Sequence, residues 1–271
     1  MNGLSKGRVL IVAGSDNSGG AGVQADIKAV TAGGGYAMTA ISALTIQDTT
    51  GVHGVHPVPL PVVLAQFDTA LADIGADAVK TGMLADASLI EDLAERFEAL
   101  PGDVAIVVDP VMVATSGDVL VGKKAMEALA ADLVPRARLV TPNAPEAEHL
   151  TGRAVESVDG QRRAADRLLE RGARAALVKG GHVGGDTITD VLHTQDGEWL
   201  FDGPRIDTRH THGTGCTLAS AIAVRLALGA GLPEGVSAAR DYLQVALERA
   251  PGFGRGKGPV HHAWPFKPSA S

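Results

Sequence analysis

The chain has 271 residues, a single cysteine and a formal net charge of −7 at pH 7. The acidic balance and the absence of any run of lysine or arginine argue against a nucleic acid or a membrane surface as the main partner. One cysteine excludes an internal disulfide and a cysteine-rich metal site, and no apolar run approaches the roughly 20 residues of a membrane span. Since the first residues also lack the apolar segment of a signal peptide, we expect a cytoplasmic protein.

Short apolar runs alternate with helical patterns along the chain, which predicts an α/β fold. Hydrophobic residues make up 45% and aromatic residues only 3%, as is typical of helices packed on a parallel sheet. The predicted strands are residues 8–13, 36–46, 78–80, 104–108, 138–141 and 175–178. The predicted helices are residues 18–32, 59–73, 87–100, 161–171 and 233–250, with one more directly after residues 213–215. Residues 189–193 and 199–202 are expected to form a β-hairpin.

We find no internal repeat, no low-complexity linker and no second domain. The prediction is therefore one domain, residues 8–266, with flexible termini at residues 1–7 and 267–271.

The loop at residues 14–22 is dense in small residues and carries one carboxylate, Asp16, with Asp26 further along the predicted helix. Gly20, Gly22 and Ala25 formally satisfy the dinucleotide fingerprint. In that fingerprint, however, the first glycine follows the strand almost at once, whereas a polar loop intervenes here. The pattern therefore disfavours a nicotinamide cofactor.

Two side chains follow predicted strands, at the end of an open α/β sheet that faces the ligand crevice. Gln47 carries a donor and an acceptor, so it suits the edge of a heterocycle, although an ordinary solvated turn residue fits as well. Asp109 suits a metal or phosphate role, although an aspartate that caps a turn is an equal alternative.

Asn143 and Glu146 stand three residues apart at the start of a helical pattern. This spacing puts an amide and a carboxylate on one helix face, where they suit a hydrated magnesium ion. The same spacing is that of a capping box, and the residues alone do not decide between the two.

Two other patterns are rejected. Residues 117–124 nearly match a P-loop but lack the Ser or Thr that would hold magnesium, so Lys123 and Lys124 are interpreted as solvated residues at a helix start. Spaced histidine pairs do not predict zinc, because no carboxylate or thiolate set completes a tetrahedral site around any of them.

Gly213, Thr214 and Gly215 lie at the entrance of a helix whose Leu218 and Ile222 mark a buried face. Unpaired backbone N–H groups and the positive end of the macrodipole make this entrance an anion site, and the glycines let a phosphate reach the main chain. Cys216 follows in the first turn, an environment that lowers a thiol pKa. It is interpreted as a base or a nucleophile, with a small buried hydrophobe as the alternative.

Six motifs stand in order along the chain: the glycine loop, Gln47, and residues 109–112, 143–146, 179–182 and 213–216. Together they resemble the hydroxymethylpyrimidine/phosphomethylpyrimidine kinases of thiamine biosynthesis, a branch of the ribokinase-like superfamily. The resemblance runs from about Arg8 to His262. It implies a doubly wound, mostly parallel sheet with helices on both faces, usually in a homodimer. It also implies that ATP and Mg²⁺ are used to phosphorylate 4-amino-5-hydroxymethyl-2-methylpyrimidine and then its monophosphate.

The resemblance also assigns site residues. The pyrimidine pocket would be lined by Gly14, Asp26, Gln47, Met83 and Val111. Glu146 and Asp109 would hold the metal, and Asn143, Lys179 and Thr214 would bind the nucleotide. Cys216, with Gly213 and Gly215, would be catalytic.

The sequence departs from two patterns of related kinases. Sugar kinases of the superfamily typically carry aspartate in place of Cys216, and the cysteine marks the pyrimidine branch and some pyridoxal kinases. The family loop usually has proline where this chain has Asn17, a change expected to alter loop stiffness more than chemistry. Three alternative functions are considered: a pyridoxal kinase, a pyrimidine-binding sensor without catalysis, and a dinucleotide-dependent oxidoreductase.

Overall fold

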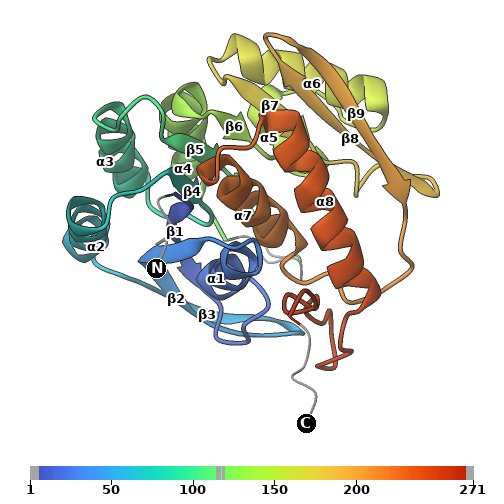
Figure 1. The fold of residues 1–271 in the computed structure, drawn as a ribbon, viewed down its shortest axis with the longest axis horizontal. Helices are drawn as coiled ribbons and strands as arrows, with labels where there is room; N and C mark the ends of the chain where they lie inside the picture. The colour runs from blue at the N-terminus through green and yellow to red at the C-terminus, as the bar shows by residue number, and fades with distance from the viewer. Residues whose placement is uncertain (1–5, 114–116, 118–119, 267–271) are drawn as a thin grey trace.

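A nine-stranded sheet forms the centre of the computed structural model, which describes residues 6–113, 117 and 120–266 (Figure 1). The strand order is β3-β2-β1-β4-β5-β6-β7-β8-β9. Neighbours from β2 to β7 pair in parallel, and the β3, β8 and β9 strands pair antiparallel at the two edges. The strands are β1 (Arg8–Ser15), β2 (Tyr36–Asp48), β3 (Gly51–Pro57), β4 (Ala78–Thr81), β5 (Ala105–Val108), β6 (Leu139–Val140), β7 (Ala175–Val178), β8 (Thr187–Thr194) and β9 (Gly197–Pro204).

Helices cover both faces of this sheet, which confirms the predicted fold class. The α-helices are α1 (Gly22–Ala32), α2 (Leu60–Asp73), α3 (Ala87–Glu98), α4 (Lys123–Ala128), α5 (Ala144–Thr151), α6 (Val158–Glu170), α7 (Thr214–Ala227) and α8 (Leu232–Glu248). A π-turn (Leu129–Leu133) and a short 3₁₀ turn (Val134–Arg136) follow α4. None of the helices within the described ranges is long and apolar enough to cross a membrane.

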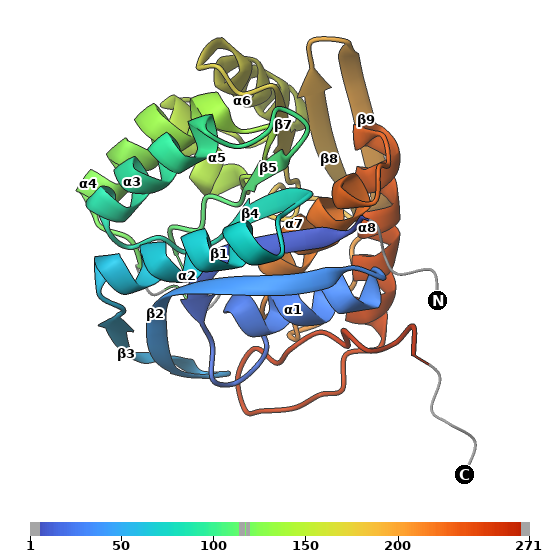
Figure 2. The same cartoon turned by 60° about the vertical axis from the view of Figure 1, so that its left-hand side comes forward.

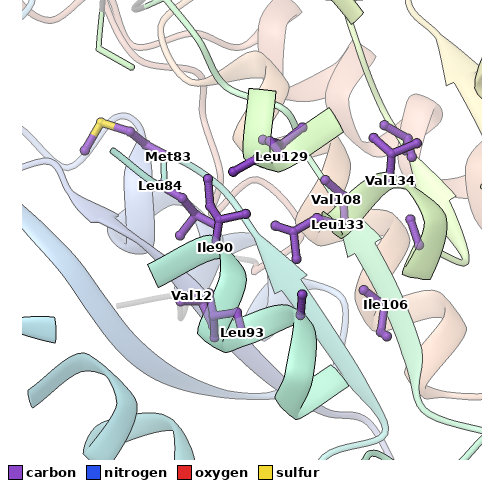
Figure 3. Packing of buried hydrophobic residues seen from close by; sticks show 14 of the residues in the cluster. Val12, Met83, Leu84, Ile90, Leu93, Ile106, Val108, Leu129, Leu133 and Val134 are labelled. Carbon is purple, nitrogen blue, oxygen red and sulfur yellow. The ribbon is translucent and has the colours of Figure 1, made fainter. Parts of the chain in front are cut away.

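The alternation of side chains along β1 shows how the two helix layers are held. Leu10 and Val12 belong to a hydrophobic cluster with α2–α6, whereas Val9 and Ile11 belong to a second cluster with α1, α7 and α8. Figure 2 shows α3, α4 and α5 on the far side of the sheet from α7 and α8. In Figure 3, Val12 lies among side chains of the first cluster such as those of α3. Because β1 is buried on both faces, it reads as one continuous apolar run.

The chain changes direction at β1. It runs from β1 outward to β2 and β3, and then returns to β4 on the other side of β1. Connections that diverge in this way leave a crevice at the carboxyl ends of the two strands, which here are Ser15 and Thr81. This is where the functional residues are found.

Several element boundaries differ from the predictions. Helix α1 begins at Gly22 rather than residue 18, because the Asp16 carboxylate holds residues 18–21 in a loop. Helix α6 begins after its N-cap, Ser157, rather than at residue 161. Strand β2 extends to Asp48 and pairs with β3, which was not predicted, so Gln47 lies in a strand rather than a turn. Helix α4 does begin at Lys123, as predicted, although residues 118 and 119 of the rejected P-loop segment lie outside the described ranges. The same holds for residues 1–5 and 267–271 of the termini expected to be flexible.

The segment after α8, residues 251–262, packs back across the molecule and is called here the strap. The Gly256 amide donates to Thr49 Oγ1 at 3.1 Å, and the His212 amide donates to the carbonyl of Gly258 at 3.0 Å. His262 Nε2 lies 2.9 Å from Thr217 Oγ1, in the first turns of α7. The strap therefore joins the β2–β3 turn to the start of α7.

Candidate active site

A cavity of about 790 Å³ lies at the carboxyl ends of the central strands. It brings together twelve of the thirteen predicted site residues: Gly14, Gln47, Met83, Asp109, Val111, Asn143, Glu146, Lys179, Gly213, Thr214, Gly215 and Cys216. The thirteenth, Asp26, does not line it. Residues from seven separate segments of the chain therefore meet in one place.

The turn before α7 depends on a glycine. Gly213 is the N-cap and has φ 78°, and a Cβ at this position would overlap the backbone oxygen of Gly20. No side chain caps α7, and Gly213, Thr214, Gly215 and Cys216 at its entrance all line the cavity. The Thr214 amide lies 3.4 Å from the carbonyl of Thr211. This arrangement is the one expected of an anion site formed by main-chain N–H groups.

Asp16 connects the loop after β1 to this turn. Its carboxylate is buried and accepts hydrogen bonds from the amides of Ser18, Gly20 and Ala21. His212 Nε2 lies 2.8 Å from Asp16 Oδ2. Burial opposes ionisation of this carboxyl, but the bonds from His212, Ser18 and Ala21 outweigh it and lower the Asp16 pKa. The ionised carboxylate thus holds two glycine-rich segments against each other.

Cys216 is half-buried in the cavity wall. The expectation of a lowered thiol pKa is wrong: burial raises the pKa of Cys216 to about 12. The nearby Lys80 ammonium and a hydrogen bond from the Gly22 amide favour the thiolate, whereas the carboxylates of Asp26 and Asp109 disfavour it. At neutral pH the resting side chain is therefore a thiol.

Asp109 and Lys179 form an ion pair at the cavity floor. Lys179 Nζ lies 3.2 Å from Asp109 Oδ1, which also accepts from Thr141 Oγ1 at 3.1 Å. Burial disfavours the ammonium, but Asp109 and Glu146 together raise the Lys179 pKa. Asp109 Oδ2 is buried and has no hydrogen-bond partner among the residues that the structure describes. A Cβ on Gly215 would lie 3.8 Å from that oxygen, so it faces the start of α7.

Asn143 and Glu146 form the capping box. Asn143 Oδ1 accepts from the Glu146 amide at 2.9 Å, and Glu146 Oε2 accepts from the Asn143 amide at 2.8 Å. Burial, together with the Asp109 charge, raises the Glu146 pKa to about 7 despite the opposing charge of Lys179. The capping bond uses one oxygen of the Glu146 carboxylate. Because a carboxylate has two oxygens, Glu146 can cap the helix and also bind a metal ion.

The carboxylates fit a magnesium ion. Asp109 Oδ2 is an unpartnered buried oxygen, and Glu146 interacts electrostatically with Asp109 and Lys179 in the same cavity wall. Oxygen ligands from one or two carboxylates are those that Mg²⁺ takes in phosphate-binding sites.

The opposite end of the cavity is formed by Gly14, Met83 and Gln47. A Cβ on Gly14 would overlap Met83 Cε, so the glycine lets the thioether lie against the backbone of β1. The backbone N–H of Gln47 donates to Asn17 Oδ1 at 2.8 Å, and this bond fixes the end of β2 to the loop after β1. This end is apolar with one amide side chain, as a small aromatic heterocycle requires.

Asp26 lies behind the cavity wall rather than in it. The side chain is fully buried, and Asp26 Oδ1 accepts from Lys80 Nζ at 2.8 Å and from Ser220 Oγ at 2.7 Å. Direct contact between Asp26 and a substrate stays a prediction, and the geometry gives this residue a bond to Lys80 instead.

Asp16, His212 and Lys80 were not predicted as functional residues. Asp16 and His212 both flank motifs that the sequence did single out, but nothing local pairs residues 196 positions apart. Lys80 stands near the end of a short strand, where a lysine normally indicates the end of burial rather than a buried charge.

Comparisons with known proteins show which family this chain resembles. Residues 16–261 match the family described as phosphomethylpyrimidine kinase. A hydroxymethylpyrimidine/phosphomethylpyrimidine kinase of Streptomyces coelicolor is 45% identical over 256 residues, which cover 94% of each chain. The thiamine biosynthesis bifunctional protein ThiED of Geobacter sulfurreducens is 47% identical over 258 residues, 95% of this chain and 52% of that protein.

The chain is also similar to a solved structure that contains ligands. The pyridoxal kinase from Staphylococcus aureus in complex with AMP-PCP and pyridoxal superposes with a TM-score of 0.86 at 34% identity. The match covers 94% of this chain and 93% of that one.

Proposed function

Because this chain belongs to the phosphomethylpyrimidine kinase family, we infer that it is a hydroxymethylpyrimidine/phosphomethylpyrimidine kinase of thiamine biosynthesis. As a transferase it phosphorylates the alcohol 4-amino-5-hydroxymethyl-2-methylpyrimidine and then the resulting monophosphate. One observation carries this inference: a single cavity holds the uncapped entrance of α7, Cys216 beside it, and the Gly14–Met83–Gln47 end that suits a heterocycle.

ATP is the proposed phosphoryl donor. The structural relative that binds AMP-PCP, an analogue of ATP, supports this. Lys179 and the amides of Gly213, Thr214 and Gly215 supply positive charge and hydrogen-bond donors for the terminal phosphate. Asn143, which caps α5 at the same cavity, is proposed to contact the nucleotide.

Glu146 and Asp109 are the proposed ligands of Mg²⁺, through the carboxylate oxygens described above. When bound, the ion neutralises negative charge on the phosphates. The protein itself contributes alignment: it holds acceptor and donor in one enclosed space and excludes water from the transfer.

For the alcohol, we propose that Cys216 accepts the hydroxyl proton. The substrate oxygen then bonds to the terminal phosphorus, the bond from that phosphorus to the bridging oxygen breaks, and ADP leaves. The monophosphate is already anionic, so the second transfer needs no base. Since burial raises the Cys216 pKa to about 12, the base role requires a group that favours the thiolate when substrate is bound.

The chain is further proposed to act in the cytoplasm as a homodimer. The family resemblance supports both, and sedimentation of the purified protein tests the second.

Pyridoxal is the second candidate acceptor, since the relative with 34% identity binds it and it also carries a hydroxymethyl group on a nitrogen heterocycle. The test is to incubate the purified protein with Mg-ATP and either alcohol, following products by mass spectrometry. We expect the mono- and then the diphosphate of the pyrimidine, with faster turnover than for pyridoxal. Absence of ATP consumption with either alcohol would contradict catalysis and favour a sensor.

A further inference from the structure

A lysine is fully enclosed beneath the active site. Lys80, the third residue of β4, has no exposed surface, and its Nζ lies 2.8 Å from Asp26 Oδ1. Lys80 is not among the described residues that line the cavity. Buried lysines are rare and are kept only where a partner holds the charge.

The pair contacts the second turn of α7, one turn beyond Cys216. Asp26 Oδ1 also accepts from Ser220 Oγ at 2.7 Å. Ser220 follows Cys216 by four residues, so the two side chains occupy the same face of the helix, one turn apart. Gly82, directly after β4, leaves room for the lysine, because a Cβ at this position would lie only 3.1 Å from Lys80 Nζ.

Four charged groups act on the thiol from the elements around it. Lys80 on β4 and Lys179 after β7 interact favourably with a negative sulfur, and Asp26 on α1 and Asp109 after β5 interact unfavourably. Lys80 is the strongest of the charges that favour it. Lys179 is paired with Asp109 in the cavity wall, whereas Lys80 is paired with Asp26 behind that wall.

We propose that Lys80 is a positioning residue for phosphorylation of the alcohol, its ammonium fixed by Asp26 beneath α7 so that it stabilises negative charge on Cys216. The inference rests on the proposed base role of Cys216. Lys80 touches neither substrate nor nucleotide: it acts through the thiol. If the ion pair were purely structural, removing it would leave the ionisation of Cys216 unchanged. Buried ion pairs also contribute little net stability.

The chain allows a direct test, because Cys216 is its only thiol. Iodoacetamide alkylates the thiolate: a sulfur–carbon bond forms, iodide leaves, and the thiol proton passes to the buffer. The rate at a fixed pH below the thiol pKa is proportional to the thiolate fraction. It is measured on the folded protein without ATP or pyrimidine, so it does not depend on turnover.

Lys80→Met is expected to lower the alkylation rate at pH 8.5 about fivefold or more, because Lys80 acts on the sulfur more strongly than Asp26, whose opposing charge is lost with it. The buried Asp26 carboxyl then takes up a proton, so the double variant Asp26→Asn/Lys80→Met should give the same rate. Lys80→Arg, which keeps the charge, should retain most of the wild-type rate. The double variant buries no unpaired charge, and it is the form to use if the single variant does not fold.

The matched control is Arg8→Met. It breaks the ion pair between Arg8 and Asp77, 2.7 Å apart at the opposite end of the sheet, and so costs stability without removing charge near the sulfur. Its alkylation rate should be that of the wild type. Unchanged rates in both Lys80→Met and the double variant, or an equal fall in Arg8→Met, would overturn the proposal.

A second measurement separates this proposal from the proposed function. Lys80→Met should reduce kcat for the alcohol by more than for the monophosphate, which needs no base. If the wild type shows no turnover, the proposed function fails whatever the alkylation rates; if it turns over and Lys80→Met changes neither alkylation nor the ratio of the two steps, only the role of Lys80 fails.

Discussion

Asp16 Oδ2 and His212 Nε2 lie 2.8 Å apart although 196 residues separate them along the chain. The contact joins the loop after β1, which borders the substrate end of the cavity, to the residue before the Gly213 turn. This buried hydrogen bond therefore ties the two ends of the cavity to each other, in addition to the contacts made by the strap.

Asp16→Ala should reduce both stability and activity. It leaves the amides of Gly20 and Ala21 and the His212 ring without their acceptor, and a buried unpaired group costs about 1–3 kcal/mol. Urea unfolding and kcat/KM measure the two effects. The control is Asp86→Ala, which removes the exposed N-cap of α3 and should cost about 1 kcal/mol with no change in turnover. A fall in activity no larger than that of the control would contradict the link.

The Asp16 carboxyl also leads us to expect that its contribution to the free energy of unfolding is lost at acid pH. The Asp16 pKa is lowered in the folded protein, so its stabilising contribution is complete above the unfolded value of about 3.9 and is lost as pH falls through the lower folded value. The difference in unfolding free energy between wild type and Asp16→Asn should accordingly shrink below pH 4. A constant difference from pH 3 to pH 7 would show that ionisation of Asp16 is not what stabilises the loop.

Gly213→Ala should abolish most activity. The residue has φ 78°, and the new Cβ would overlap the Gly20 carbonyl, so the turn must move away from the phosphate. A loss of about 10² or more in kcat is expected for displaced oxyanion donors. Gly229→Ala is a matched control, because Gly229 also has a positive φ, 92°, but open space around its Cβ. Its cost should be confined to about 1 kcal/mol of stability.

Cys216→Ala should impair phosphorylation of the alcohol more than that of the monophosphate, by about 10² or more in kcat. With a pKa raised to about 12, the thiolate fraction grows tenfold per pH unit in the accessible range. For the wild type, kcat/KM for the alcohol should therefore rise between pH 6 and pH 9, and the rise should be absent in Cys216→Ala. Equal losses in the two half-reactions would show that the thiol is not the base.

Glu146 predicts a pH-dependent stability in the absence of metal. Burial raises its folded pKa to about 7, above an unfolded value near ~4.3, so the protonated form stabilises the fold at low pH and this contribution is lost as pH rises toward 7. Relative to Glu146→Gln, the wild type should lose unfolding free energy between about pH 4 and pH 7 and change little above that. Added Mg²⁺ should restore it at pH 8 in the wild type only, as measured by thermal unfolding. Equal stabilisation of both proteins by Mg²⁺ would remove Glu146 as a ligand.

Asn17 predicts an effect on one substrate alone. Its Oδ1 accepts from the backbone N–H of Gln47 at 2.8 Å, and a proline at this position, as the resemblance would lead one to expect, has no side-chain acceptor to make that bond. Because the bond is exposed, Asn17→Ala should raise KM for the pyrimidine only a few-fold and leave KM for ATP unchanged. A parallel change in both constants would instead indicate general loosening of the loop.

The elements with local sequence signals could be predicted. The continuous apolar run of β1, the capping box at Asn143 and the glycine turn before α7 each depend on residues close in sequence, and the structure confirms all three. The family resemblance further predicted which residues form one site, and twelve of these thirteen residues line the cavity. That they bind and react as assigned stays a prediction.

What the sequence missed depends on contacts between distant segments. The β3 strand is exposed and polar, so its pairing with β2 leaves no apolar pattern to detect. Helix α1 begins late because Asp16, outside the helical pattern, holds the preceding residues. The thiol pKa was predicted from the helix entrance alone, and the burial of Cys216 outweighs that local effect.

The strap has a consequence for synthesis of the protein on the ribosome. One end of the cavity is supported by the contact of Thr49 with Gly256, and the turn before α7 by the contact of Thr217 with His262, so neither is complete until residues 251–262 have left the exit tunnel. A nascent chain halted after α8 would carry every catalytic side chain and still lack the support that holds them in register.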